Sequence, residues 1–268
     1  MPDDDHYIPN ARNAHIDTSD FERELRERFS GYKCRVEEVI EFIYKLVSSK
    51  TNIAPKEPDD SQLICRYLSP VKFLQFLHTR SINFPMATQF SDRWECRIPD
   101  DYENAVLRIL HGLGVSINDW DNLVRRKAEG WNVSCWTQLD DPFDDHLMWD
   151  SYAGGPHGVG ITVRYGVLKD CLAVPIRQLD IDGVLHCGSV NYESLSLLPF
   201  NKHYIFRNEK EIRFAFRARE TRPHRVSIDN IFDSFGIRIS PAASAEYRDT
   251  MRLLWLRYGG EDRVQWPQ

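Results

Sequence analysis

The sequence lacks the features of a membrane or secreted protein. No apolar run approaches the roughly 18 residues that a helix needs to cross a bilayer. The first ten residues, MPDDDHYIPN, are acidic and polar, whereas a secretory signal starts with basic residues and continues with an apolar stretch. We therefore expect a cytoplasmic protein with no membrane partner.

The cysteines show no pairing pattern. None of the six forms a CxxC motif, and they are scattered singly along 268 residues. They are Cys34, Cys65, Cys96, Cys135, Cys171 and Cys187. Single cysteines, most of them with apolar or aromatic neighbours, are typical of buried free thiols.

Several common catalytic motifs are also missing. The glycine-rich GGPHGVGI lacks the Lys and the Ser or Thr of a phosphate-binding loop, and neither GxGxxG nor GxSxG occurs. A kinase, a P-loop ATPase, a Rossmann dehydrogenase and an α/β-hydrolase thus lose their usual support.

Positive charge is not in excess either, because 34 Lys and Arg against 40 Asp and Glu give a net charge of −6. Any contact with nucleic acid must therefore be local.

The composition that remains is that of a folded protein. Hydrophobic residues make up 42%, aromatic residues 12% and charged residues 28% of the chain, which excludes disordered, collagen-like and coiled-coil proteins. At this length we expect one large domain with additional terminal segments.

Residues 1–62 differ in character from the rest. Ser19 opens the capping-box motif SDFE, which predicts a charged helix. Apolar residues recur every three or four positions over residues 36–47, which predicts a second helix. A linker rich in Pro, Lys, Asp and Ser follows. We therefore divide the chain into an N-terminal helical cap with its linker (1–62) and a core domain (63–268).

The core domain mixes strands and helices without a regular βαβ alternation. Strands are predicted in LICRYL, SINFPMA, WNVSCWT, GVGITVRY, VLHCGSVNYE and EIRFAFR. Helices are predicted after Ser69 with Pro70 as first residue, over residues 101–112, over 118–129 with Asn118 as cap, and over 241–258. This pattern favours an α+β fold with a mixed, largely antiparallel sheet.

Glu209, Glu211 and Arg213 form the first candidate site. A strand through them would place all three on one face, with successive residues roughly 6.5 to 7 Å apart. Two carboxylates beside a glycosidic carbon stabilise an oxocarbenium-like transition state, so this pattern indicates glycosyl-transfer chemistry. The alternative is that the three residues form cross-strand ion pairs on a solvent-facing strand and have no catalytic role.

Charge is distributed unevenly along the chain. Residues 201–225 contain eight Lys or Arg and three Glu, whereas residues 138–157 contain five Asp and no Lys or Arg. The basic stretch is either a solvated face or a phosphate-binding surface. The Asp-rich loop with His146 raises a metal site as a minor alternative, but its spacing fits no EF-hand or HExxH motif, so we expect no metal.

Trp149 and Tyr152 lie one turn apart on a short predicted helix that ends at Gly154 and Gly155. Aromatic residues at this spacing usually pack in a core. If they instead line a cleft, they offer a flat ring a surface on which to stack.

Four segments in order carry a family resemblance. They are RYLSPVKFLQFLHTRSINFPMATQFSDRWEC, VSCWTQLDDPFDDHLMWDSYAGGPHGVGI, VNYES and YIFRNEKEIRF. This order resembles a bacterial domain-of-unknown-function family, the one numbered 2971, over about residues 63–240. More distantly, the chain resembles ADP-ribosyltransferase-like toxins, in which an early Arg or His, a central aromatic residue or Ser, and a late Glu form the site.

This second resemblance implies an ADP-ribosyltransferase-like fold and a site that uses NAD⁺ as substrate. It implies that Arg66 holds the phosphates, that Tyr152 or Ser151 is the central residue, and that Glu211 bonds the ribose hydroxyl while the C1′–nitrogen bond breaks, with Glu209 beside it. The cofactor-binding residues would be Arg66, Tyr67, Trp149 and Arg213. Such a mechanism needs no metal.

The leading hypothesis is an NAD⁺-dependent ADP-ribosyltransferase-like enzyme or NAD⁺ glycohydrolase. The resemblance further implies a toxin or effector of a bacterial defence or toxin–antitoxin locus, with an antitoxin as a possible partner and a protein or nucleic acid as acceptor. One alternative is a non-catalytic binding or regulatory module. A third is a metal-dependent, nuclease-like enzyme that uses the Asp-rich loop.

Overall fold

The computed structural model describes most of the core domain. The described residues are 55–90, 104, 107–108, 110–112, 116–140, 146–191, 198–202, 204–261 and 264–265, with Arg23, Glu27, Glu38 and Phe42 as isolated helical positions. Apart from these four positions, the two predicted helices of the N-terminal cap lie outside the described residues. Half of the predicted helix 101–112 is described, and its described residues are helical.

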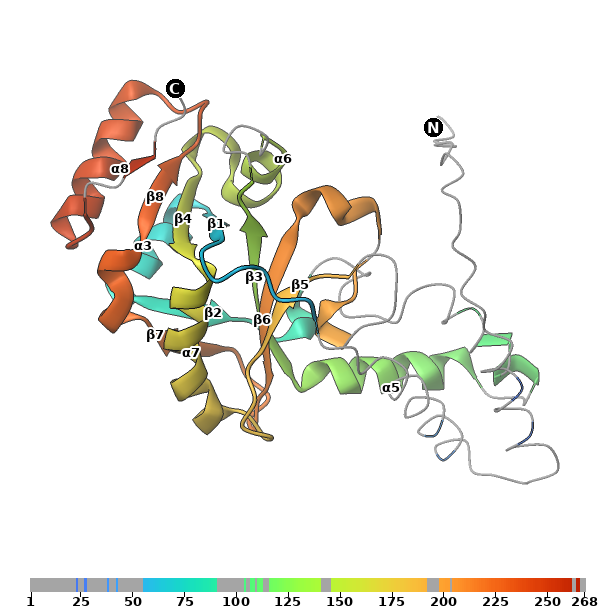
Figure 1. Ribbon diagram of the computed structural model, residues 1–268. Coiled ribbons are helices and arrows are strands. Elements are labelled where there is room, and N and C mark those ends of the chain that lie inside the picture. Colours follow the sequence, from blue (N-terminus) through green and yellow to red (C-terminus); the bar gives the residue numbers. More distant parts are fainter. Residues whose placement is uncertain are drawn as a thin grey trace, which may run out of the picture.

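Two sheets are present in the described part of the chain (Figure 1). The larger sheet has seven strands in the order β5-β6-β3-β1-β4-β8-β9, and only β8 and β9 pair in parallel. Its strands are β1 (Leu63–Leu68), β3 (Trp131–Gln138), β4 (Val159–Arg164), β5 (His186–Ser189), β6 (Glu211–Arg217), β8 (Gly236–Ile239) and β9 (Val264–Gln265). The smaller sheet pairs β2 (Ser81–Phe84) with β7 (His224–Ser227). The predicted α+β class with a mixed, largely antiparallel sheet is confirmed.

The helices are interspersed with these strands along the chain, without a regular alternation. They are α3 (Pro70–Thr79), α5 (Ile117–Glu129), α6 (His146–Met148), α7 (Tyr165–Leu179) and α8 (Ala245–Arg257). Shorter turns of helix are η1 (Ala87–Gln89), η2 (Trp149–Ala153), η3 (Gly155–His157), η4 (Leu198–Phe200), η5 (Tyr204–Glu209) and η6 (Asp229–Ser234). In Figure 1, α7 lies in front of the sheet and α8 lies beside β8.

Local sequence signals explain where several helices begin. Pro70 follows Ser69 and is the first residue of α3, as predicted. Proline has no backbone N–H, and the first turn of a helix does not need one. The predicted cap of α5 was wrong: Ser116 is the N-cap, and its hydroxyl accepts a hydrogen bond from the Asn118 N–H. Helix α8 begins later than predicted, after Ser244, whose hydroxyl accepts from the Tyr247 N–H.

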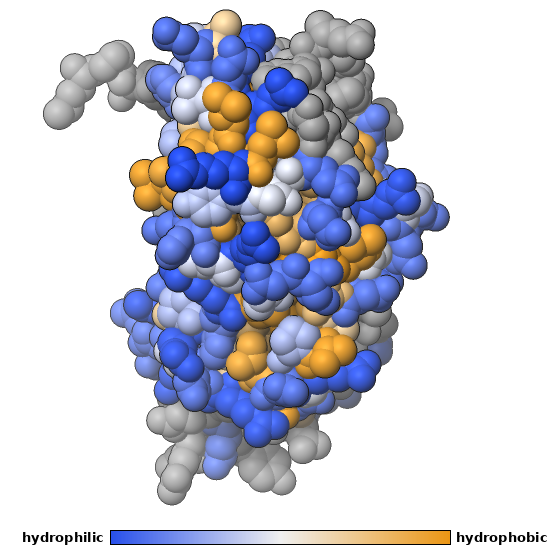
Figure 2. Space-filling model, turned by 90° about the vertical axis from the view of Figure 1, so that its left-hand side faces the viewer, coloured by the Kyte–Doolittle hydropathy of each residue, from blue (hydrophilic) through white to orange (hydrophobic). Residues whose placement is uncertain are grey.

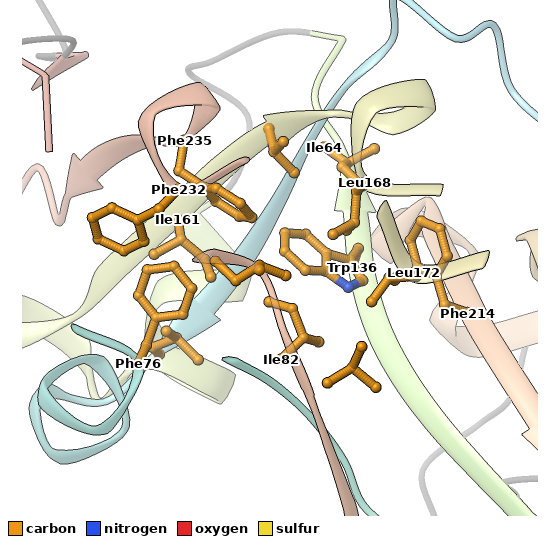
Figure 3. Close-up of a cluster of buried hydrophobic side chains, with 14 of the residues drawn as sticks. Ile64, Phe76, Ile82, Trp136, Ile161, Leu168, Leu172, Phe214, Phe232 and Phe235 are labelled. Atoms are coloured by element: carbon orange, nitrogen blue, oxygen red, sulfur yellow. The ribbon is translucent and has the colours of Figure 1, made fainter. Parts of the chain in front are cut away.

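The main hydrophobic core lies on one face of the large sheet. Alternate residues of β6, including Phe214, point into it, and α7 contributes Leu168 and Leu172. Figure 3 shows the Trp136 indole between these two leucines and Ile82 of the small sheet. Each such fully buried side chain stabilises the fold by about 1.5–3 kcal/mol.

The face of the molecule shown in Figure 2 is mostly polar among the described residues. On the face shown in Figure 2, hydrophobic side chains occur in small groups separated by hydrophilic ones. Among the helices of the described residues, none has the length and apolar character required for a membrane span.

The end of the linker packs on the core. Glu57 and Asp60 both pair with Lys169 of α7, each with an N–O distance of 2.9 Å. The Lys56 carbonyl accepts a hydrogen bond from the Ser189 N–H of β5. Residues 55–62, which the sequence assigns to the linker, are thus attached to the α7 and β5 side of the sheet.

A buried aspartate organises the turn between α7 and β5. The sequence DIDG predicts this turn, and the strand that follows is shorter than predicted, covering only His186–Ser189. Asp180 is buried, and one of its carboxylate oxygens accepts from the Asp182 and Val184 N–H groups. The other oxygen accepts from the Arg217 N–H at the end of β6.

We expect Asp180→Ala to lower the free energy of unfolding by about 3 kcal/mol, because it leaves three backbone N–H groups without their charged acceptor. The measurement is urea unfolding followed by circular dichroism. The matched control is Asp182→Ala, which removes only an exposed ion pair with Arg217 and costs at most about 1 kcal/mol. Equal losses in the two variants would contradict this account of the turn.

Candidate active site

A cavity of about 490 Å³ opens where two central strands separate. Strand β1 pairs with β4 along its whole length, but its register with β3 includes only Ile64 with Gln138 and Cys65 with Thr137. Beyond Cys65, side chains of both strands line the cavity. Further parts of the wall come from α3, β2, η1, α6, η2, β4, β7 and the segment that leads into β6. A volume of this size suits a nucleotide-sized ligand.

The small sheet supports this opening. The Phe84 carbonyl accepts from the Asn132 side-chain amide at 2.9 Å, and the Pro85 carbonyl accepts from the Val133 N–H at 2.9 Å. Both bonds connect the end of β2 with β3. The Asn83 carbonyl accepts from Arg66 Nη1 of β1 at 3.1 Å. One end of β2 is therefore bonded to both of the strands that separate.

The cavity brings together five of the eight predicted site residues, which are far apart in the sequence. Those that line it are Arg66, Tyr67, Tyr152, Glu209 and Glu211. The other three, Ser151, Trp149 and Arg213, do not line it. Ser151 is exposed outside the cavity, whereas Trp149 and Arg213 are buried behind its wall.

Glu209 and Glu211 both form an ion pair with Lys202. Lys202 Nζ lies 2.7 Å from Glu209 Oε2 and 3.0 Å from Glu211 Oε2. Glu211 also forms a two-point ion pair with Arg213, whose Nε donates to Oε1 at 2.7 Å and whose Nη2 donates to Oε2 at 3.0 Å. The Tyr152 hydroxyl donates to Glu209 Oε1 at 2.7 Å. We call Glu209, Glu211, Lys202, Arg213 and Tyr152 the carboxylate network.

The backbone of this network differs from the prediction. Glu209 is the last residue of η5 and not part of the strand, which begins at Glu211. Lys210 between them has a φ of 45°, in the left-handed region, so the chain turns here. The carboxylates converge because both bond Lys202, not because they share the face of a strand.

The solvent-face alternative is also corrected. Glu209 and Glu211 are each 5% exposed and Arg213 is 0% exposed, whereas a solvated strand face would leave them accessible to water. The reason is that both faces of β6 are covered, which leaves only Arg217 at its end exposed.

The charges of the network set its protonation. Burial by itself would raise the pKa of Glu211, but the adjacent Arg213 and Lys202 cations outweigh it and hold the pKa well below its ordinary value of 4.5. Burial raises the pKa of Tyr152, and its hydrogen bond to Glu209 raises it further. At neutral pH the network therefore holds ionised Glu211 and a protonated Tyr152 hydroxyl.

Arg66 occupies a different part of the cavity. Its Nη1 donates to Ser134 Oγ at 2.8 Å and to the Asn83 carbonyl, which are both uncharged acceptors. No carboxylate of the described residues pairs with it, and partial burial lowers its pKa. Two exposed cations that also line the cavity, Lys72 and Arg225, have no ion pair with any described residue. This wall therefore carries uncompensated positive charge.

Trp149 does not line the cavity but packs against Tyr67, which does. Its ring meets that of Tyr67 edge to face, with centroids 4.9 Å apart, and the Arg238 guanidinium lies 5.7 Å from the Trp149 ring centroid. Arg238 Nη1 also lies 3.3 Å from the Tyr67 hydroxyl. Trp149 thus supports Tyr67, and the prediction that it lines the site with Tyr152 is corrected.

Sequence reasoning missed Lys202, which has no periodic or motif context. The only available signal was its place in the basic stretch 201–225. In the fold, its Nζ lies 4.6 Å from the Phe206 ring centroid in addition to its carboxylate partners. The missed cavity residues Cys135 and Asn83 likewise belong to ordinary strand patterns.

The metal-dependent alternative remains a hypothesis. Within the described residues, no three His, Cys, Asp or Glu side chains gather as potential metal ligands. Most of the Asp-rich loop, residues 141–145, lies outside the described residues, and Asp140 pairs with Lys210 at 3.1 Å.

Comparisons with protein-family models, with curated proteins and with solved structures find no match to this chain. The resemblances to the family numbered 2971 and to ADP-ribosyltransferase-like toxins therefore stay predictions.

We expect Glu211→Gln to lower the free energy of unfolding by about 3 kcal/mol at neutral pH, because Arg213 is left buried without its counter-charge. A lowered folded-state pKa stabilises the protein above the ordinary value of 4.5, and this contribution is lost as the pH falls through the folded-state pKa. The difference between wild type and variant should therefore shrink below pH 4.5. Urea unfolding at neutral and acidic pH measures it.

The control for this experiment is Glu129→Gln. The Glu129 side chain is 43% exposed and pairs with Arg125 at 3.9 Å, so its replacement should change stability by less than about 0.5 kcal/mol at either pH. A loss in Glu211→Gln that does not depend on pH would refute the electrostatic explanation.

Proposed function

We propose that this chain binds NAD⁺ in the cavity and transfers ADP-ribose to a macromolecule or to water. The observation that carries the proposal is that one nucleotide-sized cavity is lined by an arginine without a carboxylate partner and by a buried pair of carboxylates. These are the groups that a dinucleotide phosphate and a ribosyl transition state need.

The cationic wall suits the phosphates of the substrate. A partly buried charge without an ionic partner is unfavourable, and an anionic ligand removes this cost. Arg66 holds one planar guanidinium at the wall, and Lys72 and Arg225 add further positive charge nearby. Guanidinium groups bind phosphate oxygens in two-point hydrogen bonds, which favours a phosphate-bearing ligand over a simple carboxylate.

The surroundings of the carboxylates suit the ribosyl group. Tyr67 and Tyr152 also line the cavity, and their aromatic rings offer a surface against which the nicotinamide ring packs. When the C1′–nitrogen bond breaks, its electron pair goes to the nicotinamide nitrogen and positive charge develops on the ribose. The carboxylates at Glu209 and Glu211 stabilise this charge, and an acceptor then forms a bond to C1′ and loses its proton.

The biological setting of the proposal comes from the resemblance alone. It is a cytoplasmic toxin or effector of a bacterial defence or toxin–antitoxin locus, inhibited by a partner protein. Its acceptor is a protein or a nucleic acid, and the basic stretch 201–225 contributes Arg225 to the cavity wall.

A second candidate is a non-catalytic nucleotide-binding module. The observation in its favour is that Lys202 and Arg213 already neutralise both carboxylates, so the network has no net charge with which to stabilise a cation. Under this alternative the cavity binds a phosphate-bearing ligand and leaves it intact.

We expect NAD⁺ to raise the melting temperature of the full chain, because a ligand that binds only the native state stabilises that state. We also expect the chain to release nicotinamide from NAD⁺. Arg66→Gln should weaken NAD⁺ binding about 10-fold to 100-fold, since it removes a charged hydrogen-bond donor to phosphate. Thermal-shift titration measures binding, and chromatography measures nicotinamide.

Arg164→Gln is the matched control, because Arg164 is exposed at the end of β4 and does not line the cavity. Its NAD⁺ affinity should equal that of the wild type. Binding without nicotinamide release would favour the second candidate, and no effect of NAD⁺ on the melting temperature would reject the first.

A further inference from the structure

We propose that Glu209, and not Glu211, is the carboxylate that contacts the substrate and takes the proton of the acceptor. Glu211 is then a positioning residue that holds Lys202 and, through it, Glu209. This inference rests on the proposed function and assigns different roles within the same network.

Glu211 has no acceptor capacity left. An ionised carboxylate offers about four lone-pair sites to hydrogen-bond donors. Arg213 supplies two donors to Glu211, and Lys202 supplies a third. The Cys135 thiol forms a further hydrogen bond with this carboxylate. A substrate hydroxyl would have to displace one of these donors, and three of them are charged.

Glu209 has capacity to spare. From the described residues it accepts one hydrogen bond on each oxygen, from the Tyr152 hydroxyl at 2.7 Å and from Lys202 Nζ at 2.7 Å. About two lone-pair sites therefore remain, on a side chain that lines the cavity and is only 5% exposed. Buried acceptors are costly when they lack donors, so this carboxylate is suited to a donor that arrives with the ligand.

The rest of the network fixes Glu209 in place. Arg213 Nη1 donates to the Pro199 carbonyl at 2.8 Å, so the guanidinium that holds Glu211 is itself held by the backbone. Glu211 in turn holds Lys202, and Lys202 holds Oε2 of Glu209. Tyr152 of η2 bonds the other oxygen, on a turn that ends at Gly154 with a φ of 86°.

The reaction step follows from this arrangement. The C1′–nitrogen bond of NAD⁺ breaks, and its electron pair neutralises the nicotinamide nitrogen. The acceptor oxygen forms a bond to C1′, and its proton passes to Glu209, which later releases it to solvent. With water as acceptor, NAD⁺ and water give ADP-ribose, nicotinamide and one proton, so atoms and charge balance.

The experiment compares Glu209→Gln and Glu211→Gln in the full chain, with and without sodium azide. Azide is a nucleophile that has no proton to lose, so it attacks C1′ without a base. We expect Glu209→Gln to release nicotinamide at least about 100-fold more slowly than wild type, and azide to restore most of the rate with formation of ADP-ribosyl azide. Glu211→Gln should also be slow, but azide should not restore it, because Lys202 and Glu209 have lost their support.

Two controls make the comparison independent of folding. Glu220→Gln removes an exposed carboxylate that pairs with Arg222 outside the cavity, and its rate should equal that of the wild type. If Glu209→Gln does not fold, Glu209→Asp replaces it, since the shorter side chain keeps the charge beside Lys202. The same loss and the same recovery with azide are then expected.

The outcomes separate this inference from the proposed function. A wild-type rate in Glu209→Gln, or recovery with azide in Glu211→Gln alone, would overturn the inference and leave NAD⁺ cleavage standing. Absence of nicotinamide release from the wild type would overturn the proposed function and the inference with it.

Discussion

The candidate site depends on one buried ammonium group, that of Lys202. Removing a charge from water costs several kcal/mol, and this cost is recovered only when opposite charges surround it with good geometry. Lys202 meets this requirement by bonding Glu209 and Glu211, while Arg213 supplies the fourth charge. Because two cations balance two carboxylates, no member can be removed without leaving another uncompensated. The segment before β6 is therefore fixed by electrostatics as much as by packing.

Much of the fold could be predicted from the sequence wherever a local signal agreed with the tertiary structure. The alternation in EIRFAFR identified β6, and Ser69 with Pro70 marked the start of α3. Helix α7 was missed because Pro175 lies inside it and argues against a helix, although packing of its apolar face stabilises it. Strands β7 and β8, with four residues each, are too short to show a reliable period.

The site was less accessible to sequence reasoning, for a physical reason. Arg66, Tyr152 and Glu211 were singled out and line one cavity, but the pattern did not reveal which neighbours neutralise them. Lys202 lies nine positions before Glu211, a spacing that belongs to no regular element, and both η5 and the turn at Lys210 lie between the two residues. Contacts that depend on such turns leave no periodic trace in a sequence.

The bonds that join β2 to both separated strands have a consequence for ligand entry. Arg66 is bonded to the Asn83 carbonyl, and the next two carbonyls of the chain are bonded to β3, so the strands cannot close on each other without breaking these contacts. The gap therefore exists before any ligand arrives. Binding of a ligand therefore requires no separation of the strands, and the free energy of binding is not reduced by the cost of such a change.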